Sequence, residues 1–507
     1  MLALAVAATL AAPDFASREA DWRNGAVVYH AFVDRFAPSA NLDAKRHLYA
    51  SPRKLKAWSD LPVGGSQLPE HGVWSHELDF WGGDLPSLRA KLDHIAGLGA
   101  DVLYLNPIHE AFTNHKYDAT DWKRVAPEYG TQADLEALIA DLHRDKRKLV
   151  LDGVFNHAGR ANKLFQEGLA NPNSPYRSWF EIGSQHPLGY RAWAGVPNLP
   201  EVALENPAAR DYLWRKPDSV VAHFLKMGVD GWRLDVAHEI GFEHLAELTR
   251  SAHEHKAGSL VIGEAWVYPS RWTQSMDALM NIFLGHLVVG FAKEEVSGRK
   301  MAAALDGMIA DCGIEPVLKS WIVLANHDMP RLATRLPDPR LRKMAVALQF
   351  ALPGSPMVYY GDEVGMVGGD DPAQRAPMRW DLVTDTNEDL AWHRKVAGIR
   401  AKSRALKIGD CQTLASDALF AFVRTTEDAL DTTIVVANPT SKPVTETLVV
   451  PVPTLLGYTQ LRDELGGGTI RVAVGSIRPT VPPHSVQVYR IVEEPGRHDQ
   501  YKRLRDG

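Results

Sequence analysis

The chain has 507 residues, with 56 lysines and arginines against 62 aspartates and glutamates, which gives a formal net charge of −6 at pH 7. This length indicates two or three domains, and the lack of a basic excess argues against nucleic acid or an anionic membrane as a partner and favours a neutral substrate. The only cysteines, Cys312 and Cys411, lie far apart in the sequence, so neither a disulfide framework nor a cysteine metal site is predicted.

The N-terminal segment, residues 1–20, has features of a leader. Its apolar run and small residues are typical of an export signal, but the positive region that normally comes first is missing. We interpret it as an export signal or a disordered terminus, with export to the periplasm or the medium slightly favoured over a cytoplasmic location. No later run reaches ~18 apolar residues, so no membrane span is predicted.

From residue 25 to about residue 400, short apolar runs alternate with segments of helical period, a pattern typical of a parallel α/β fold. The predicted helices include residues 85–98, 134–144 and 208–227. Eight strands are predicted, at residues 26–33, 101–106, 149–154, 231–235, 260–264, 277–281, 321–326 and 357–361. The series predicts a (β/α)8 TIM barrel formed by residues 21–157 and 206–402. In that fold, catalytic residues lie at the carboxyl ends of strands.

Three further segments differ in composition from the barrel. Residues 158–205, after the third strand, are rich in proline, glycine, asparagine and aromatic residues, which predicts an inserted lobe, domain B, over the barrel mouth. Residues 403–492 carry short alternating strands and predict a C-terminal antiparallel β-sandwich. Residues 493–507 form a strongly charged tail, for which disorder is predicted.

Three carboxylates, Asp235, Glu264 and Asp328, each stand at the end of an apolar run that reads as a buried strand. Strand ends of one barrel meet at one rim, so the three are expected to share a pocket. Such a set suits cleavage of a sugar, in which one carboxylate attacks the anomeric carbon and another protonates the leaving oxygen. Arg233 lies on the same strand face as Asp235 and is expected to keep that carboxylate ionised.

Four segments occur in order along the chain: DGVFNH at 152–157, GWRLDVAHE at 231–239, GEAW at 263–266 and ANHD at 325–328. Together they resemble the α-amylase family, glycoside hydrolase family 13, from about residue 21 to the end of the chain. The resemblance implies a barrel, an inserted lobe and a C-terminal sandwich. It also implies that Asp235 is the nucleophile, that Glu264 is the general acid and base, and that Asp328 distorts the substrate and stabilises the transition state.

The resemblance also suggests residues that bind substrate. His157 and His327 would hydrogen-bond to sugar hydroxyls beside the scissile bond, and Tyr117 would stack on the sugar being cleaved. Asp371 and Arg375 would contact the next glucose toward the non-reducing end. The expected binding set is completed by three residues of the segment around the nucleophile: Arg233, His238 and Glu239.

The segment around Glu239 also points to a branch of the family. A glutamate here, and the segment VPNLPEV at 196–202, resemble the neopullulanase, cyclomaltodextrinase and maltogenic amylase branch, although that branch usually has asparagine at His238. The calcium site of α-amylases normally uses a histidine where Glu239 stands, which leaves Asn156 as the matching ligand. No required cofactor is therefore predicted. Calcium is disfavoured at this site, although a carboxylate can also bind it.

The function predicted from the sequence is a retaining α-glucan hydrolase that cleaves α-1,4 bonds of maltodextrins, starch or cyclodextrins through a covalent glycosyl-Asp235 intermediate. One alternative is a transferase or isomerase of the same family, of sucrose or trehalose type, which differs only in its acceptor. Another is a non-catalytic carbohydrate-binding or scaffold protein, which would be favoured by a missing carboxylate. The expected partner is an α-glucan or oligosaccharide, and a monomer is predicted because no extra N-terminal module precedes the barrel.

Overall fold

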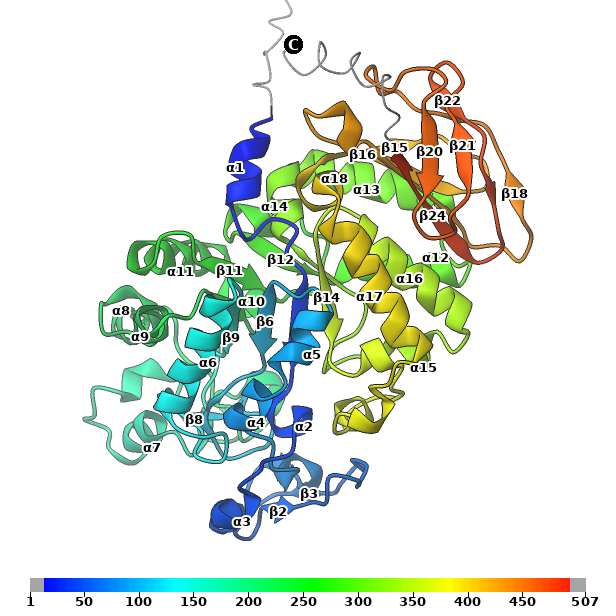
Figure 1. Cartoon of the computed structure of the whole chain (residues 1–507). Helices are drawn as coiled ribbons and strands as arrows, with labels where there is room; N and C mark the ends of the chain where they lie inside the picture. Colours follow the sequence, from blue (N-terminus) through cyan, green and yellow to red (C-terminus); the bar gives the residue numbers. More distant parts are fainter. Residues whose placement is uncertain (1–12, 493–507) are drawn as a thin grey trace, which may run out of the picture.

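Eight parallel strands close into a barrel at the centre of the computed structural model, which describes residues 13–492 (Figure 1). Each strand overlaps one of the eight predicted strands, so the predicted TIM barrel is confirmed. The predictions for residues 1–12 and for the charged tail, 493–507, lie outside the described residues. Around the barrel the order is β1 (Val28–Ala31), β14 (Ser355–Tyr359), β13 (Trp321–Val323), β12 (Ala278–Asn281), β11 (Leu260–Gly263), β10 (Gly231–Leu234), β9 (Lys148–Gly153) and β6 (Val102–Leu105).

Both faces of the barrel strands are buried. Val28, Tyr104 and Val150 belong to a cluster that fills the barrel, whereas Tyr29 and Leu103 belong to the cluster between the strands and the outer helices. Successive residues of a strand point to opposite faces, so a strand covered on both sides is apolar at every position. This explains why the strands read as continuous apolar runs in the sequence.

Helices surround the barrel, and two of the predicted ones are broken. Residues 85–98 form α4 (Leu85–Arg89) and α5 (Leu92–Gly97). Residues 208–227 are divided into α8 (Pro207–Arg210), a π-helical turn η5 (Asp211–Arg215) and α9 (Val220–Met227). Lys216 is extended, with φ −80° and ψ 157°, because Pro217 disfavours helical backbone in the residue before it. The remaining long outer helices are α6 (Gln132–Arg144), α11 (Phe242–His255), α12 (Ile282–Ala292), α13 (Gly298–Cys312), α16 (Pro339–Ala351) and α17 (Glu388–Ala401).

Two long segments follow strands of the barrel. One, residues 37–84 after β1, carries the hairpin of β3 (Gln67–Leu68) and β4 (Val73–Trp74), which the sequence did not predict. The other, after β9, contains α7 (Lys163–Ala170) and lies within the predicted insert. The two meet where Gly72, in the hairpin turn, packs against Pro197, so close that an added Cβ would lie 2.9 Å from the Pro197 Cβ.

The C-terminal part of the chain is antiparallel, as predicted. Figure 1 shows it in orange and red, at the far end of the molecule from β2 (Lys54–Leu55) and β3. Its main sheet has the order β15 (Asp410–Leu414), β16 (Phe420–Thr425), β17 (Thr433–Asn438), β24 (Ser485–Ile491), β20 (Gln460–Asp463), β21 (Thr469–Arg471). Two short pairs complete it, β18 (Val444–Thr445) with β23 (Thr480–Val481) and β19 (Leu448–Val449) with β22 (Ser476–Ile477).

The N-terminal end of the described chain is folded against both the barrel part and the C-terminal sheet. Residues 15–20, within the segment interpreted as a signal or a disordered terminus, instead form α1 (Phe15–Ala20). Arg18 in this helix is 5% exposed and pairs with Glu315 at 2.6 Å and with Asp410 at 2.8 Å. Within residues 13–492, no helix has the length and apolar character needed to cross a membrane.

Arg400 on α17 connects a residue before β1 with the end of α16 and the turn that follows it, and this contact generates a stability prediction. Its buried guanidinium donates to the carbonyls of Gly25 at 2.9 Å and of Phe350 and Gly354 at 2.6 Å. We expect Arg400→Met to lower the free energy of unfolding by about 3 kcal/mol or more, since each buried carbonyl left without a donor costs roughly 1 to 3 kcal/mol. Urea denaturation measures this, with Arg394→Met as the control on the exposed face of the same helix; equal losses would contradict the prediction.

Candidate active site

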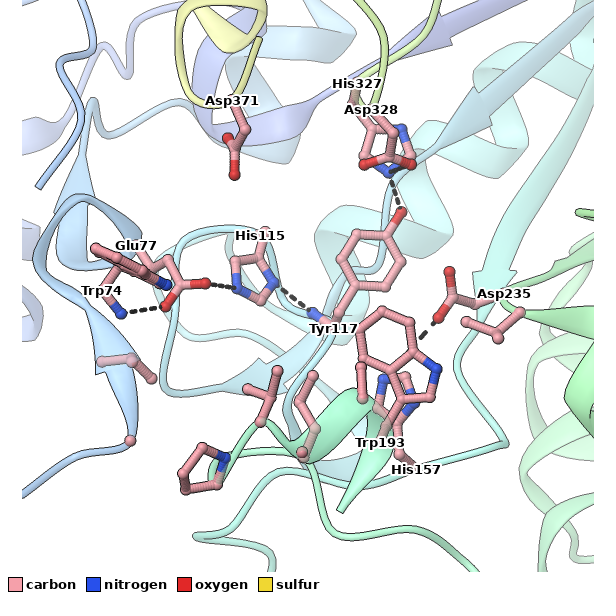
Figure 2. A pocket seen from close by; sticks show the side chains of 18 of the residues that line it. Trp74, Glu77, His115, Tyr117, His157, Trp193, Asp235, His327, Asp328 and Asp371 are labelled. Carbon is pink, nitrogen blue, oxygen red and sulfur yellow. Dashed lines mark hydrogen bonds and ion pairs between the residues drawn. The ribbon is translucent and has the colours of Figure 1, made fainter. Parts of the chain in front are cut away.

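One cavity of about 910 Å³ contains most of the side chains selected from the sequence (Figure 2). Asp235, Glu264 and Asp328 all line it. Asp235 directly follows β10, Glu264 directly follows β11, and Asp328 lies in the segment after β13. The carboxyl ends of the strands therefore bring the three together, as predicted. The cavity is also lined by Tyr117, His157, His238, His327, Asp371 and Arg375. Of the remaining predicted residues, Arg233 lies in the barrel beneath it, and Glu239 lies beside it in contact with Asn156.

Arg233 is the centre of a buried charge cluster. Its Nη1 donates to Asp152 at 2.7 Å and to Asp235 at 2.9 Å, and its Nη2 lies 2.8 Å from Glu264. The register explains the geometry, because Arg233 is paired with Asp152 across β9 and β10, and Leu234 is paired with Gly263 across β10 and β11. The residues that follow, Asp235 and Glu264, thus emerge at one level on adjacent strands.

The cluster carries more negative than positive charge. Burial raises the pKa of Asp235 well above its ordinary value, Arg233 opposes this, and the charges of Glu264 and Asp152 add to it. The sequence predicted that Arg233 keeps Asp235 ionised, but the structure shows one guanidinium shared by three carboxylates, which does not outweigh the effect of burial on the pKa of Asp235. A buried site with three carboxylates and one guanidinium favours a state in which the carboxylates share a bound proton.

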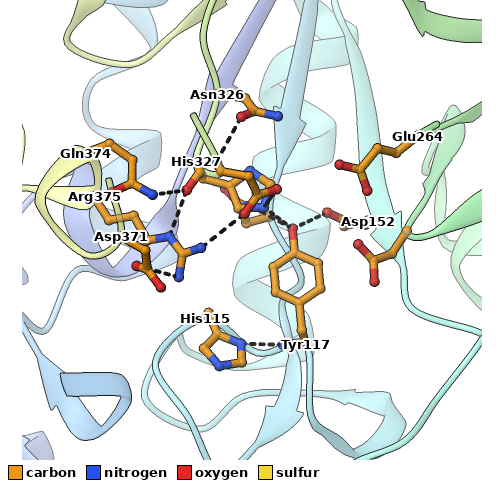
Figure 3. Close-up of polar contacts among 12 residues, drawn as sticks. His115, Tyr117, Asp152, Glu264, Asn326, His327, Asp371, Gln374 and Arg375 are labelled. Atoms are coloured by element: carbon orange, nitrogen blue, oxygen red, sulfur yellow. Dashed lines mark hydrogen bonds and ion pairs between the residues drawn. The ribbon is translucent and has the colours of Figure 1, made fainter. Parts of the chain in front are cut away.

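A second group of contacts joins the loops after β13 and β14 (Figure 3). Arg375 donates to Asp328 at 3.1 Å and to the His327 carbonyl at 2.9 Å, and it pairs with Asp371 at 3.2 Å. Partial burial acts to raise the pKa of Asp371, but a hydrogen bond with His76 and the charge of Arg375 outweigh it and lower that pKa to about 2. Asp371 therefore stays ionised and available as an acceptor.

Tyr117 connects these two groups. Its hydroxyl lies 2.9 Å from Asp152 Oδ2 and 2.6 Å from His327 Nε2, and its ring is nearly parallel to the His327 ring, with centroids 5.4 Å apart. Burial lowers the pKa of His327 well below its ordinary value, so its ring is neutral at pH 7. Tyr117 and His327 thus form one flat wall beside the carboxylates.

His157 offers unused hydrogen-bonding capacity to the cavity. It is 1% exposed, its ring centroid lies 5.5 Å from that of Trp193, and neither ring nitrogen has a hydrogen-bond partner among residues 13–492. Burial lowers its pKa to about 3. A neutral imidazole with free nitrogens on a cavity wall is equipped to bind the hydroxyls of a ligand.

Away from the carboxylates, the wall contains side chains that the sequence reasoning missed (Figure 2). Trp74 is 45% exposed, and its backbone N–H donates to Glu77 Oε2 at 2.6 Å. Glu77 in turn lies 3.4 Å from His115, whose ring centroid is 5.7 Å from that of Tyr117. Glu77 lies outside the four family-like segments, so no local signal indicated it. The same holds for Trp74 and Trp193.

Asn156 and Glu239, the positions considered for calcium, are bonded to each other. The Asn156 amide donates to Glu239 Oε2 at 2.8 Å. Calcium requires six to eight oxygen ligands, and in the described part of the chain no three His, Cys, Asp or Glu side chains are grouped so as to hold a metal ion. At this position the structure shows an amide–carboxylate pair, in which the Asn156 and Glu239 side chains satisfy each other.

Comparison with known proteins agrees with this geometry. A family model described as the catalytic domain of alpha amylase matches residues 31–391. The cyclomaltodextrinase of Geobacillus thermopakistaniensis is 30% identical over 483 residues, covering 93% of this chain and 78% of that protein. Neopullulanase 2 of Thermoactinomyces vulgaris is 30% identical over 478 residues, covering 92% and 77%.

A solved structure shows the same similarity over the whole described fold. The cyclic α-maltosyl-(1→6)-maltose hydrolase of Arthrobacter globiformis, in complex with maltose, has a TM-score of 0.78 at 30% identity, covering 93% of this chain and 100% of that chain. The names of these relatives agree with the predicted branch. The chain therefore belongs to the α-amylase family of glycoside hydrolases, as the four sequence segments predicted, and it is similar to cyclomaltodextrinase and neopullulanase members of that family.

Proposed function

We propose that this enzyme hydrolyses α-1,4-glucosidic bonds of α-glucans, such as maltodextrins, starch or cyclodextrins, with retention of anomeric configuration. The observation that carries the proposal is the placement of Asp235 and Glu264 on one guanidinium, at adjacent strand ends and facing the cavity. Two carboxylates on one cavity wall are what a double displacement requires. Similarity to a cyclomaltodextrinase and a neopullulanase supports the substrate class.

In the first step, the Asp235 carboxylate attacks the anomeric carbon while Glu264 gives its proton to the leaving oxygen. A covalent ester with Asp235 results. In the second step, Glu264 removes a proton from water, the water oxygen bonds to the anomeric carbon, and the Asp235 carboxylate is released. The first step takes one proton from Glu264 and the second step returns one, so the cluster regains its total charge at the end of the cycle.

The surrounding side chains position the sugar in this proposal. Tyr117 presents a flat face to the apolar side of the ring undergoing cleavage, and His157 and His327 hydrogen-bond to its hydroxyls. Asp328 holds hydroxyls on the distorted ring, and Asp371 and Arg375 contact the next glucose toward the non-reducing end. Every step uses side chains of the chain and substrate alone, and the Asn156–Glu239 pair is assigned no metal.

The two central carboxylates are tested by separate substitutions. We expect Asp235→Asn to lower kcat on maltotriose by more than about 10³-fold. Glu264→Gln should lower kcat on maltotriose by a similar factor. On α-maltosyl fluoride, whose leaving group needs no proton, the same variant should keep most of the rate of the first step. The ester should then accumulate on Asp235, visible by intact-protein mass spectrometry.

Asp43→Asn is the control for this experiment, since Asp43 lies on the surface with its side chain 89% exposed. Proton NMR of the wild-type reaction should show the α-anomer as the first product. A β-anomer would contradict retention. Rearranged disaccharides without free sugar would favour the transferase alternative.

The low pKa of His157 predicts how stability depends on pH. Its pKa of about 3 lies below the ordinary 6.5 of the unfolded chain. The contribution of the neutral ring to the free energy of unfolding is therefore complete above pH 6.5 and is lost as pH falls toward 3. At pH 5 this loss is about 2 kcal/mol. We expect His157→Gln to flatten the decline in unfolding free energy between pH 7 and 5 by that amount, whereas exposed His47→Gln should leave it unchanged; equal slopes in all three proteins would refute this.

Trp74 is proposed to bind a glucan residue beyond Asp371. Its exposed indole stands on the cavity wall, on the far side of His115 from Tyr117 (Figure 2). We expect Trp74→Ala to raise KM for maltopentaose roughly three- to tenfold, the loss of about 0.5–1.5 kcal/mol of stacking, with a smaller change for maltotriose. Leu61→Ala, which removes a 68% exposed side chain from the same loop, is the control. Equal KM changes for both substrates would argue against a distal subsite.

A further inference from the structure

A cavity of about 200 Å³ lies at the end of the barrel opposite the three carboxylates. Ala26, Asp101 and Lys148 line it where β1, β6 and β9 begin, and two short helices, α1 and α18 (Arg404–Ile408), border it. Figure 1 shows both helices at the end of the molecule away from β3. No step of the proposed hydrolysis uses this cavity.

Three lysines of the wall carry positive charge that the protein leaves largely unneutralised. Among residues 13–492, the ammonium groups of Lys146 and Lys407 have no hydrogen-bond or ion-pair partner. Lys148 lies 3.5 Å from Asp230, but that carboxylate also pairs with Lys256 at 3.0 Å. A chain with a formal net charge of −6 therefore has a local excess of positive charge at this cavity.

The carboxylates of the wall do not neutralise these lysines. Glu19 pairs with Arg404 at 2.9 Å, and Asp21 pairs with Arg23 at 2.8 Å. Asp101 accepts one backbone N–H through its Oδ2 at 2.9 Å, and within residues 13–492 no cation pairs with it. Three lysines thus face a single unpaired carboxylate, which favours an anionic ligand. Lysine binds phosphate groups as a point charge.

The remaining groups of the wall suit hydroxyls and an apolar ring face. Asn24 is 8% exposed; its Nδ2 donates to the Arg18 carbonyl at 2.9 Å, and its Oδ1 has no partner among the described residues. Like the second oxygen of Asp101, this atom can only accept, so it requires a ligand that donates, as a sugar hydroxyl does. Trp22 adds a flat apolar face, since its Nε1 is already bonded to the Gly258 carbonyl at 3.0 Å.

We propose that this cavity binds a phosphorylated monosaccharide. Its phosphate group is held by Lys146, Lys148 and Lys407, and its hydroxyls face Asn24 and Asp101. The inference concerns a ligand outside the proposed hydrolysis and does not depend on that reaction. Because the ligand bridges the segment after α1, the starts of β6 and β9, and α18, its binding raises the free energy of unfolding.

Isothermal titration calorimetry of the full chain with glucose 6-phosphate, inorganic phosphate and glucose tests the site. We expect glucose 6-phosphate to bind one-to-one and about tenfold more tightly than inorganic phosphate, because its hydroxyls add hydrogen bonds. Lys146→Gln/Lys407→Gln should weaken its binding about tenfold or more, as for the loss of hydrogen bonds to charged groups. Lys293→Gln/Lys300→Gln removes the same charge from two exposed lysines without ion-pair partners in the described chain, and it should bind like the wild type.

Glucose 6-phosphate should also raise the Tm of the wild type and of the control but not that of the cavity variant, and a cooperative transition shows that each protein is folded. Equal weakening in both double variants, or none in either, would overturn the proposal. Displacement of glucose 6-phosphate by glucose would overturn it in favour of the catalytic cavity. Equal affinity for inorganic phosphate and glucose 6-phosphate would refute the sugar part. Since titration needs no turnover, the absence of maltotriose hydrolysis would refute the proposed function alone, and the absence of binding would refute this inference alone.

Discussion

The active site depends on one buried guanidinium. Arg233 is fully buried in the barrel, and it contacts three carboxylates: Asp152, Asp235 and Glu264. Three carboxylates brought together out of water would repel one another by several kcal/mol, and a shared cation offsets part of that cost. Because one positive charge cannot neutralise three negative ones, burial still raises the pKa of Asp235. The excess of negative charge that destabilises the buried cluster is also the property that favours a proton bound among its carboxylates.

From this centre, hydrogen bonds connect loops that are distant in sequence. Tyr117, after β6, reaches Asp152 on β9 and His327 after β13. Arg375, after β14, reaches the His327 carbonyl and Asp328. The rigid strands fix the positions of the carboxylates, and these cross-contacts fix the loops against the strands. His327 therefore joins the loop that carries Tyr117 to the loop that carries Arg375.

Much of the barrel and the carboxylate set could be predicted from the sequence, because strands buried on both faces give continuous apolar runs and their ends carry the acidic residues. Helix continuity was predicted less well, since Pro217 interrupts a segment that keeps helical period on both sides. The β3–β4 hairpin was missed because two-residue strands leave no periodic signal. Trp193 and Trp74 reach the cavity only through the packing of the two long loops, at Gly72 and Pro197, and such long-range contacts have no local signature.

The catalytic cavity and a second cavity of about 460 Å³, which Trp266 also lines, differ in chemistry. Beyond Tyr117, ionised and neutral polar groups such as Asp371, Arg375 and His157 face the ligand. Beyond Trp266, the wall is mostly apolar; its Tyr268 hydroxyl donates to Asp311, and one nitrogen of its Arg335 donates to the Leu324 carbonyl. The polar and the apolar wall meet near Glu264, which accepts a hydrogen bond from the Trp266 indole at 3.2 Å. The Arg233 cluster thus lies at the boundary between a wall equipped to hydrogen-bond hydroxyls and a wall equipped for apolar contacts, so the two sides of the carboxylates differ in the chemistry that they accommodate.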